Sequence, residues 1–293
     1  MFLFQRMEEL GVSGNTALAA IAAYILENRE EVLKKSLQEV AEETYTSKAS
    51  VVRFAKALGY SGWKEFIKDY LHELNYQKQF RQEVDFSFPF RADSNEEEIA
   101  DSLRTLAIQT LDDTMENLDY GSLRRIVNLI QRASRIVIFC VPPHTYSAEL
   151  FRRKMMSIQK PVSVVRSREM GLNARALTQD DLAILISYSG SNPEVEPMNV
   201  VRYLRENRVP MAAITSAGPN YLREQISTVL TMTTMEALYN KIGTFSTEDS
   251  LQFLLNLIYS CYFARAYERN QANKIESSRL LETHKRRSEN IPD

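Results

Sequence analysis

Apolar residues recur at intervals of three and four from residue 16 to residue 74, with almost no strand signal between them. This spacing lines one face of a helix, so the segment predicts a small all-helical domain. Pro89 and the polar cluster at residues 92–95 interrupt the pattern, which resumes from Glu96 to Ala133. We therefore predict a helical domain over residues 1–76 and a partly helical linker over residues 77–120.

From Arg135 onward the pattern changes to short β-branched runs separated by helical segments. The runs read RIVIFCV, PVSVV, LAILIS, MAAIT and STVLTM. Strands that alternate with helices predict a parallel sheet covered by helices, and nearly all-apolar runs are typical of strands buried on both faces. We predict an α/β domain over residues 121–272, with a five-stranded, parallel, doubly wound sheet and flanking helices.

The last strongly apolar segment, from Thr247 to Asn270, predicts one long helix that is apolar around most of its circumference. Such a helix is expected to be buried, either on the sheet or against another subunit. It favours a homodimer or homotetramer over a lone monomer. The tail after Ile275 has no core-forming pattern, so residues 273–293 are expected to fray.

Composition fits a protein of two ordinary globular domains, with 293 residues of which 44% are hydrophobic and 25% charged. No apolar stretch approaches the roughly 20 residues of a membrane span, and the start MFLFQRMEEL carries acids where a signal peptide is apolar. We expect a cytoplasmic protein with no membrane partner. Cys140 and Cys261 lie in separate apolar runs, which favours reduced thiols. His72, His144 and His284 share no ligand spacing, so neither a metal site nor a cofactor is predicted.

The helical domain contains a segment with the layout of a helix-turn-helix. One helix (Ser36 to Glu43) is followed by a short turn and a second helix that starts near Ser47, a residue suited to cap it. The formal net charge of the chain is -2, yet the stretch from Ser47 to Lys68 holds five cations and one acid. A DNA-binding surface would have to be such a local patch. The candidate DNA-binding residues are Ser47, Lys48, Ala49, Ser50, Arg53 and Lys56. The alternative is a helical bundle whose cations are merely solvated.

The same stretch resembles the N-terminal domain of the RpiR family of bacterial transcriptional regulators. That family has an isoleucine or leucine before xELA, a turn rich in serine or threonine, and then RFxKxLGFxGF. The matching residues here are Leu37, Val40, Ala41, Ser47, Ser50, Val51, Arg53, Phe54, Leu58, Gly59, Tyr60, Gly62 and Trp63. The resemblance implies that Ser47 to Lys56 enters the major groove of a double-stranded DNA operator, in two copies from a dimer.

A second motif follows the third apolar run, where the sequence reads ISYSGSNPE from Ile186 to Glu194. Ligands of open parallel sheets bind at the carboxyl ends of the strands, where helix N-termini offer backbone N–H groups. Ser187 and Ser189 would place hydroxyls there, Gly190 permits close backbone approach, and Pro193 fits a first helical turn. A phosphate is the expected guest. The alternative is an ordinary loop that caps a helix.

This motif resembles the signature SxSGxT of the SIS (sugar isomerase) domain, and the resemblance covers residues 135–267. RpiR-type regulators carry this domain behind their helix-turn-helix. The resemblance implies a sugar phosphate effector held by Ser187, Ser189 and, less closely, Asn192, with Tyr188 and Gly190 in the same loop. Asparagine replaces the threonine of the signature, but its side-chain amide can still donate to an oxyanion.

The loop after the first strand departs further from that domain. The family has GxGxS there, whereas this chain reads CVPPH, with Pro142, Pro143 and His144. Proline donates no N–H and fixes φ, so this loop cannot wrap an anion in the family's way. His144 either contacts a phosphate through its ring or is an ordinary loop histidine. The pocket is accordingly expected to be reshaped, specialised or vestigial.

Three function classes follow. Isomerases of this fold need a base such as a glutamate, and the suggestive acids, Glu248 and Asp249, fit equally well as acids at a helix N-terminus. The fused basic helix-turn-helix favours a regulator without catalytic residues. We therefore predict a DNA-binding regulator of sugar metabolism controlled by a sugar phosphate. The alternatives are a phosphosugar isomerase and a DNA-bound scaffold that responds to no ligand.

Overall fold

The computed structural model describes residues 3–12, 14–80 and 84–288. The chain divides into two compact units. The first comprises the residues up to Asp113 together with Ala217–Pro219 and Thr233–Thr247, and the second comprises Thr114–Ser216, Asn220–Met232 and the chain from Glu248. Each unit has a hydrophobic core of its own.

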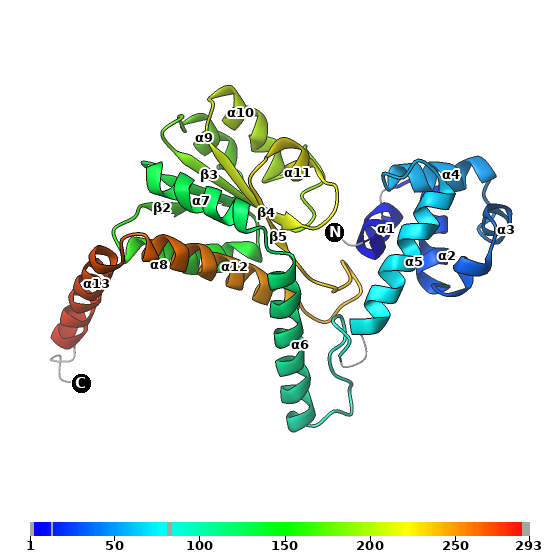
Figure 1. Cartoon of the computed structure of the whole chain (residues 1–293), viewed down its shortest axis with the longest axis horizontal. Helices are drawn as coiled ribbons and strands as arrows, with labels where there is room; N and C mark the ends of the chain where they lie inside the picture. Colours follow the sequence, from blue (N-terminus) through cyan, green and yellow to red (C-terminus); the bar gives the residue numbers. More distant parts are fainter. Residues whose placement is uncertain (1–2, 13, 81–83, 289–293) are drawn as a thin grey trace. The chain divides into compact units, whose positions relative to one another are not determined.

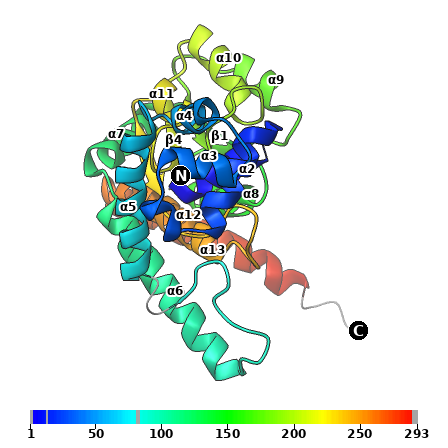
Figure 2. The ribbon, with the colours of Figure 1, turned by 90° about the vertical axis from the view of Figure 1, so that its right-hand side faces the viewer.

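The N-terminal residues form a helical bundle, drawn in blue and cyan in Figures 1 and 2. Its helices are α1 (Leu3–Gly11), α2 (Thr16–Glu27), α3 (Leu37–Glu43), α4 (Lys48–Ala57) and α5 (Trp63–Phe80), with a 3-10 helix at Glu31–Lys34. The predicted all-helical domain is confirmed. The structure adds α1, which lies before the predicted pattern and buries Phe4 and Met7 in the bundle core.

Aromatic side chains hold α4 against α5. The ring centroids of Phe54 and Phe66 lie 5.5 Å apart in an edge-to-face arrangement, and those of Phe66 and Tyr70 lie 5.7 Å apart. All three side chains are fully buried. The Tyr70 hydroxyl donates to the Arg29 carbonyl at 2.9 Å, so the ring is buried without leaving its polar end unsatisfied.

The helical segment predicted from Glu96 to Ala133 is two helices, α6 (Glu96–Glu116) and α7 (Tyr120–Arg132). The break has a local cause. Asp119 is the N-cap of α7, and its carboxylate accepts from the Gly121 N–H at 2.7 Å and the Ser122 hydroxyl at 2.6 Å. Residues 81–83 of the predicted linker lie outside the described residues.

The second unit contains the predicted sheet, with five strands that are all parallel in the order β2-β1-β3-β4-β5. The strands are β1 (Ile136–Cys140), β2 (Val162–Val164), β3 (Leu182–Ile186), β4 (Met211–Ser216) and β5 (Val229–Met232). Each coincides with one of the five apolar runs, with β4 one residue longer than its run, so the fold class predicted from the sequence is confirmed. The order is that of flavodoxin-like sheets, whose strand order reverses between β1 and β3.

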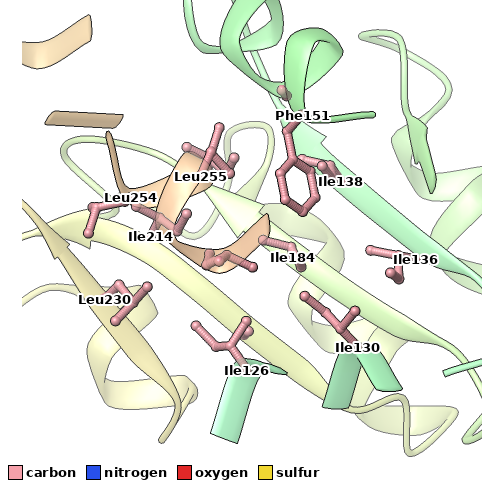
Figure 3. Close-up of a cluster of buried hydrophobic side chains, with 14 of the residues drawn as sticks. Ile126, Ile130, Ile136, Ile138, Phe151, Ile184, Ile214, Leu230, Leu254 and Leu255 are labelled. Carbon is pink, nitrogen blue, oxygen red and sulfur yellow. The ribbon is translucent and has the colours of Figure 1, made fainter. Parts of the chain in front are cut away.

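Helices cover both faces of the sheet. One face is covered by α7, α8 (His144–Met156) and α12 (Phe245–Ala264), and the other by α9 (Met170–Arg175), α10 (Val201–Glu206) and α11 (Tyr221–Gln225). Figure 3 shows the first face, where Ile136 and Ile138 of β1 meet Ile130 of α7 and Phe151 of α8. Since strand side chains alternate between faces, Val137 and Phe139 point into the second core.

The C-terminal region corrects two predictions. The helix expected from Thr247 to Asn270 is broken at Arg265–Ala266, between α12 and α13 (Tyr267–Ser288). Asn270 is buried, and its side-chain amide donates to the Phe263 carbonyl at 3.0 Å, which satisfies an acceptor at the end of α12. The tail expected to fray after Ile275 is helical to Ser288, because polar residues such as Glu, Lys and Arg have good helix propensity. Residues 289–293 lie outside the described residues.

Candidate functional site

The first candidate site is the exposed side of α4, whose start is fixed by local hydrogen bonds. The Ser47 hydroxyl accepts from the Ser50 N–H at 3.1 Å, as predicted for an N-cap. The preceding helix α3 begins with a capping box between Ser36 and Glu39. Both helices of the motif therefore begin at residues that hold their first turns in place.

Three cations lie along one side of α4. Lys48, Arg53 and Lys56 are all exposed, and helical geometry places them within an arc of about 140°. Ala49, also exposed, lies in the same arc and leaves room for close approach. The opposite side carries Val51 and Phe54, which are fully buried in the bundle core. The side of α4 that the sequence assigned to DNA is thus free of contacts with the bundle core.

Ser50 corrects this set, because only 5% of its surface is exposed. Its hydroxyl lies 3.0 Å from the Ser47 hydroxyl and accepts from an Arg53 guanidinium N–H at 3.0 Å. The residue is occupied inside the bundle and does not present a free group to a partner. What it does is hold the Arg53 side chain at the surface of α4.

The second candidate site lies at the carboxyl edge of the sheet, where β1 and β3 end. Cys140 is paired with Ile186, so the segments CVPPH and SYSGSN leave the sheet from neighbouring strands at the same level. This is the point at which the strand order reverses, and ligands of such sheets bind there. Two segments that are more than 40 residues apart in sequence are thus brought together.

The loop after β3 turns back on itself through its own polar groups. The Ser187 hydroxyl accepts from the Gly190 N–H at 3.2 Å, and the Tyr188 carbonyl accepts from the Ser216 N–H at 3.1 Å. The Tyr188 side chain packs against the core beneath α12. These bonds fix the loop against β4 and leave Ser187 buried.

Beyond these contacts the loop retains unused donors. Within the described residues, the N–H groups of Ser189, Ser191 and Asn192 and the Ser189 hydroxyl donate to no protein acceptor. The Asn192 carboxamide oxygen accepts from the Glu194 N–H at 2.9 Å, so the amide nitrogen of that side chain is the end left to donate. Together these free donors make a donor surface suited to an anion.

The position of Gly190 leaves no room for a side chain. Its φ is +59°, and a Cβ there would lie 2.5 Å from the Thr215 hydroxyl and 3.1 Å from the Asn220 side-chain oxygen. The Gly190 carbonyl also accepts from the Leu222 N–H at 3.0 Å, which joins the loop to α11. No other residue fits this close approach without moving its neighbours.

The neighbouring loop after β1 offers no comparable donors. Pro142 and Pro143 have no N–H, and the His144 N–H is used by the Val141 carbonyl at 3.1 Å. The prediction that CVPPH does not wrap an anion with its backbone agrees with this geometry. His144 is the first residue of α8 and is half-buried, so its ring is the polar group this loop brings to the edge.

One local expectation at this site is wrong. Pro193 does not lie in a first helical turn, because residues 193–197 form turns and the next helical residues are the 3-10 segment Met198–Val200. The Asn192 side chain closes a turn on Glu194, and Glu196 binds the Ser167 hydroxyl and the Arg168 N–H. These side-chain bonds compete with a helix start. The donors after β3 therefore come from the loop itself and not from a helix that begins at Pro193.

Comparison with known proteins identifies both parts of the chain. Residues 6–74 match the family described as "Helix-turn-helix domain, rpiR family", and residues 129–255 match "SIS domain". The first match contains α3 and α4, and the second contains the carboxyl edge with both loops. The chain thus has an rpiR-family helix-turn-helix domain followed by a SIS domain. It is a transcriptional regulator with a sugar-isomerase-like domain.

Relatives of similar architecture extend over most of this chain. An HTH-type transcriptional regulator of Clostridium perfringens is 23% identical over 96% of this chain and 99% of its own length. One of Haemophilus influenzae is 27% identical over 82% of each. Among solved structures, the Vibrio vulnificus NanR protein complexed with ManNAc-6P has a TM-score of 0.60 at 21% identity, covering 95% of this chain and 97% of that one. The sugar isomerase domain of an RpiR transcription factor from Sphaerobacter thermophilus has a TM-score of 0.54 at 18% identity and covers 61% of this chain and 98% of that one.

One buried acid of the C-terminal region was not predicted from the sequence. Glu236, in the loop after β5, is 1% exposed, and its carboxylate accepts from the Thr247 hydroxyl at 2.7 Å and from the N–H groups of Ser246 and Thr247. Burial raises the pKa of Glu236. The carboxylate thus accepts from N–H groups in the first turn of α12 that have no acceptor within the helix. A glutamate nine residues before a helix has no sequence signal as a cap, because it reaches the helix only through the fold.

The two acids noted from the sequence lie in the first turns of α12. Glu248 is exposed, whereas burial and the neighbouring Glu248 charge raise the pKa of Asp249. Among the described residues, no group of three or more His, Cys, Asp and Glu is placed to hold a metal ion. Burial raises the pKa of Cys140 to about 12, so its thiol stays protonated. In the part of the chain that the structure covers, no helix has the length and apolar character to span a membrane.

Proposed function

We propose that this RpiR-family regulator binds double-stranded DNA through α4 and that a sugar phosphate at the carboxyl edge of the SIS domain controls the binding. The observation that carries the DNA-binding part is the exposed cationic side of α4, on a helix capped by Ser47 and packed behind by Phe54. A recognition helix of this kind lies in the major groove. No catalytic step is assigned.

In the proposed complex the three exposed cations have separable roles. Arg53, whose guanidinium is supported by Ser50, is the candidate for a bidentate contact to guanine. Lys48, at the first turn, and Lys56, at the last, are candidates for phosphate contacts that set the position of the helix. The Ser47 hydroxyl oxygen already accepts from the Ser50 N–H as the cap of α4, so it would contact a phosphate only by donating its proton.

The effector site is the donor surface formed by Ser189, Ser191 and Asn192 in the loop after β3. Its donors are three backbone N–H groups and the Ser189 hydroxyl, in a loop whose Tyr188 carbonyl is bonded to β4 and whose Gly190 carbonyl is bonded to α11. The likeness to NanR, a protein solved with ManNAc-6P, supports a phosphosugar as the class of ligand. His144 would approach the same ligand from the neighbouring loop. Because Pro142 and Pro143 have no N–H, the loop after β1 is expected to make fewer hydrogen bonds to the phosphate.

Control of DNA binding requires two states that the sugar distinguishes. We propose that the protein acts as a dimer or tetramer and that the bound sugar phosphate changes how the sensing domains pair. The spacing of the two recognition helices would then change, and with it the affinity for a palindromic site.

The test starts with selection of binding sequences from random and genomic DNA by the full-length chain. The best duplex is then titrated at fixed salt with and without a panel of sugar phosphates, because protein–DNA affinity depends strongly on salt. Enrichment of a palindrome supports the DNA-binding part, and a shift with one sugar phosphate supports the sensor. Enrichment without any shift at millimolar sugar favours the scaffold. No enrichment would contradict the regulator and direct attention to isomerase turnover.

A further inference from the structure

Tyr45 lies in the turn between α3 and α4 and is 98% exposed, the largest exposure of any big apolar side chain among the described residues. Its φ is +51°, in the left-handed region that a bulky residue rarely adopts. No hydrogen bond, ion pair or ring contact of its side chain occurs within the described part of the chain. A single exposed tyrosine is ordinary, but an exposed tyrosine with an unfavourable backbone conformation is not.

The left-handed conformation is imposed by the end of α3. The Thr46 N–H donates to the Ala41 carbonyl at 2.8 Å, and the Tyr45 N–H donates to the Glu42 carbonyl at 3.1 Å. These are the paired bonds of a Schellman cap, in which the residue at the Tyr45 position must have positive φ. Glycine meets that requirement without steric cost.

The same domain ends α4 with the same cap and does use glycine. There the Tyr60 N–H donates to the Ala55 carbonyl at 3.0 Å and the Gly59 N–H to the Lys56 carbonyl at 2.9 Å, with Gly59 at φ +88°. Two equivalent helix ends thus differ in one respect. At the end of α4 the left-handed position is Gly59, the residue that the cap favours. At the end of α3 it is Tyr45, whose side chain the cap disfavours and which makes no contact that stabilises the bundle.

The turn holds Tyr45 in a fixed place beside the proposed DNA contacts. Buried Thr44 donates to the Val40 carbonyl at 2.7 Å, and its hydroxyl lies 2.9 Å from that of Thr46. Tyr45 therefore stands on a rigid turn, two residues before the Ser47 cap and three before Lys48. In helix-turn-helix complexes the first helix crosses the DNA backbone while the start of the second contacts bases, so the turn between them lies beside backbone phosphates.

We propose that Tyr45 is a DNA-positioning residue whose phenol hydroxyl donates to a backbone phosphate next to the groove that α4 enters. The inference rests on the proposed DNA-binding function and adds a neutral contact to the cationic ones. Tyrosine hydroxyls are among the groups that bind DNA phosphates, and such contacts set register without reading sequence. Because the group is uncharged, it should leave the salt dependence of binding unchanged.

The test compares full-length wild type with Tyr45→Gly and Tyr45→Phe, using the best selected duplex and an unrelated duplex of equal length. Both variants are expected to bind both duplexes about fivefold to tenfold more weakly, the effect of losing one hydrogen bond to a charged acceptor, with the same slope against salt. Tyr45→Gly is also expected to unfold at a higher temperature, because it relieves the left-handed tyrosine. A loss of affinity together with a gain of stability cannot come from damage to the fold. Tyr120→Phe, which removes a hydroxyl from an exposed tyrosine on α7, is the matched control and should bind like wild type.

Two results would overturn the inference. If wild type binds the selected duplex and Tyr45→Gly binds it equally well, the protein binds DNA but Tyr45 does not contribute to the binding. If the variants lose affinity for the selected duplex alone, Tyr45 reads bases and the phosphate contact is wrong. Failure of wild type to bind any duplex would instead overturn the proposed function, and this inference with it.

Discussion

On α4 the candidate DNA contacts are side chains, whereas in the loop after β3 the candidate phosphate contacts are mainly backbone N–H groups. Lys48, Arg53 and Lys56 project from a regular helix with its own cap and its own buried side. The donors of Ser189, Ser191 and Asn192 exist only because the loop bends in one particular way.

The difference determines how each surface can fail. A side chain of α4 can be removed while the helix stays, because Val51 and Phe54 hold it from behind. In the loop after β3, the residues that hold the backbone in place and the N–H groups that would contact the ligand belong to the same short segment. Its shape depends on Gly190, on the Ser187 hydroxyl and on residues of β4 and α11, so damage to the support should also remove the donors.

The largest effect is expected for Gly190→Ala. The added Cβ would lie 2.5 Å from the Thr215 hydroxyl at a φ of +59°, so overpacking and left-handed strain should together lower the unfolding free energy of the SIS domain by about 2–4 kcal/mol. The response to a sugar phosphate should disappear with it. Denaturant unfolding and effector titration measure the two effects.

Gly171→Ala provides the control for that variant within the same unit. Gly171 lies in α9, where an added Cβ meets only a Tyr203 ring carbon at 3.9 Å, and alanine is the better helix former. This change should leave stability equal or slightly higher. A Gly190→Ala protein that is as stable as Gly171→Ala would contradict the claim that the loop depends on close approach.

Arg53→Ala tests the opposite expectation on α4. The variant should weaken binding to the selected duplex by about 1–3 kcal/mol, roughly fivefold to 150-fold, while thermal unfolding stays unchanged. Titration at fixed salt against selected and mismatched duplexes measures the loss and shows whether discrimination between bases falls. Arg124→Ala, which removes an exposed arginine of α7, is the control. Equal affinity of Arg53→Ala and wild type would exclude the guanidinium from recognition.

The same contrast explains what the sequence could predict. Periodicity locates α4 and its exposed side, because a helical residue's direction follows from its position, and each apolar run locates a strand. Ser50 shows the limit, since its polar side chain suggested a DNA contact, whereas it lies four residues before Phe54 on the buried side of α4 and bonds the Ser47 and Arg53 side chains. The turns after Asn192 and the break before α13 were missed because side-chain bonds of Asn192 and Asn270 decide them. Glu236 was missed because a loop of the fold brings it to α12.

Asp181→Asn separates stability from sensing on the strand that leads into the loop. Asp181 precedes β3 at the end of the strand opposite Ser187, and hydrogen bonds from Arg135 lower its pKa to about 2. A lowered pKa stabilises the folded state above the ordinary carboxyl range, and this contribution is lost as the pH falls from about 4 toward 2. Arg135 is half-exposed, which reduces the effect, so the variant should lose about 1–2 kcal/mol at pH 7.

The measurement for that variant is denaturant unfolding at pH 7, 4 and 2.5, together with sugar titration at pH 7. The variant's stability should change less than that of wild type between pH 4 and pH 2.5, and its sugar response should persist. Asp101→Asn, which breaks an exposed pair with Arg104 on α6, should change little. Loss of the sugar response in Asp181→Asn would show that the loop depends on the whole strand and not on its own contacts.

The smallest effect is expected for Ser189→Ala, which removes one donor and leaves the backbone of the loop in place. Its hydroxyl has no protein acceptor among the described residues, so the unfolding free energy should stay unchanged. Affinity for the sugar phosphate should fall by about 1 kcal/mol, roughly fivefold. Ser191→Ala is the matched control, because the Ser191 hydroxyl already donates to the Ser189 carbonyl at 3.0 Å. Effector titrations of both variants, with DNA affinity measured in the absence of sugar, make the comparison. If Ser189→Ala responds like wild type and Ser191→Ala does not, the Ser189 hydroxyl does not bind the ligand, and the site depends instead on the bond from the Ser191 hydroxyl to the Ser189 carbonyl.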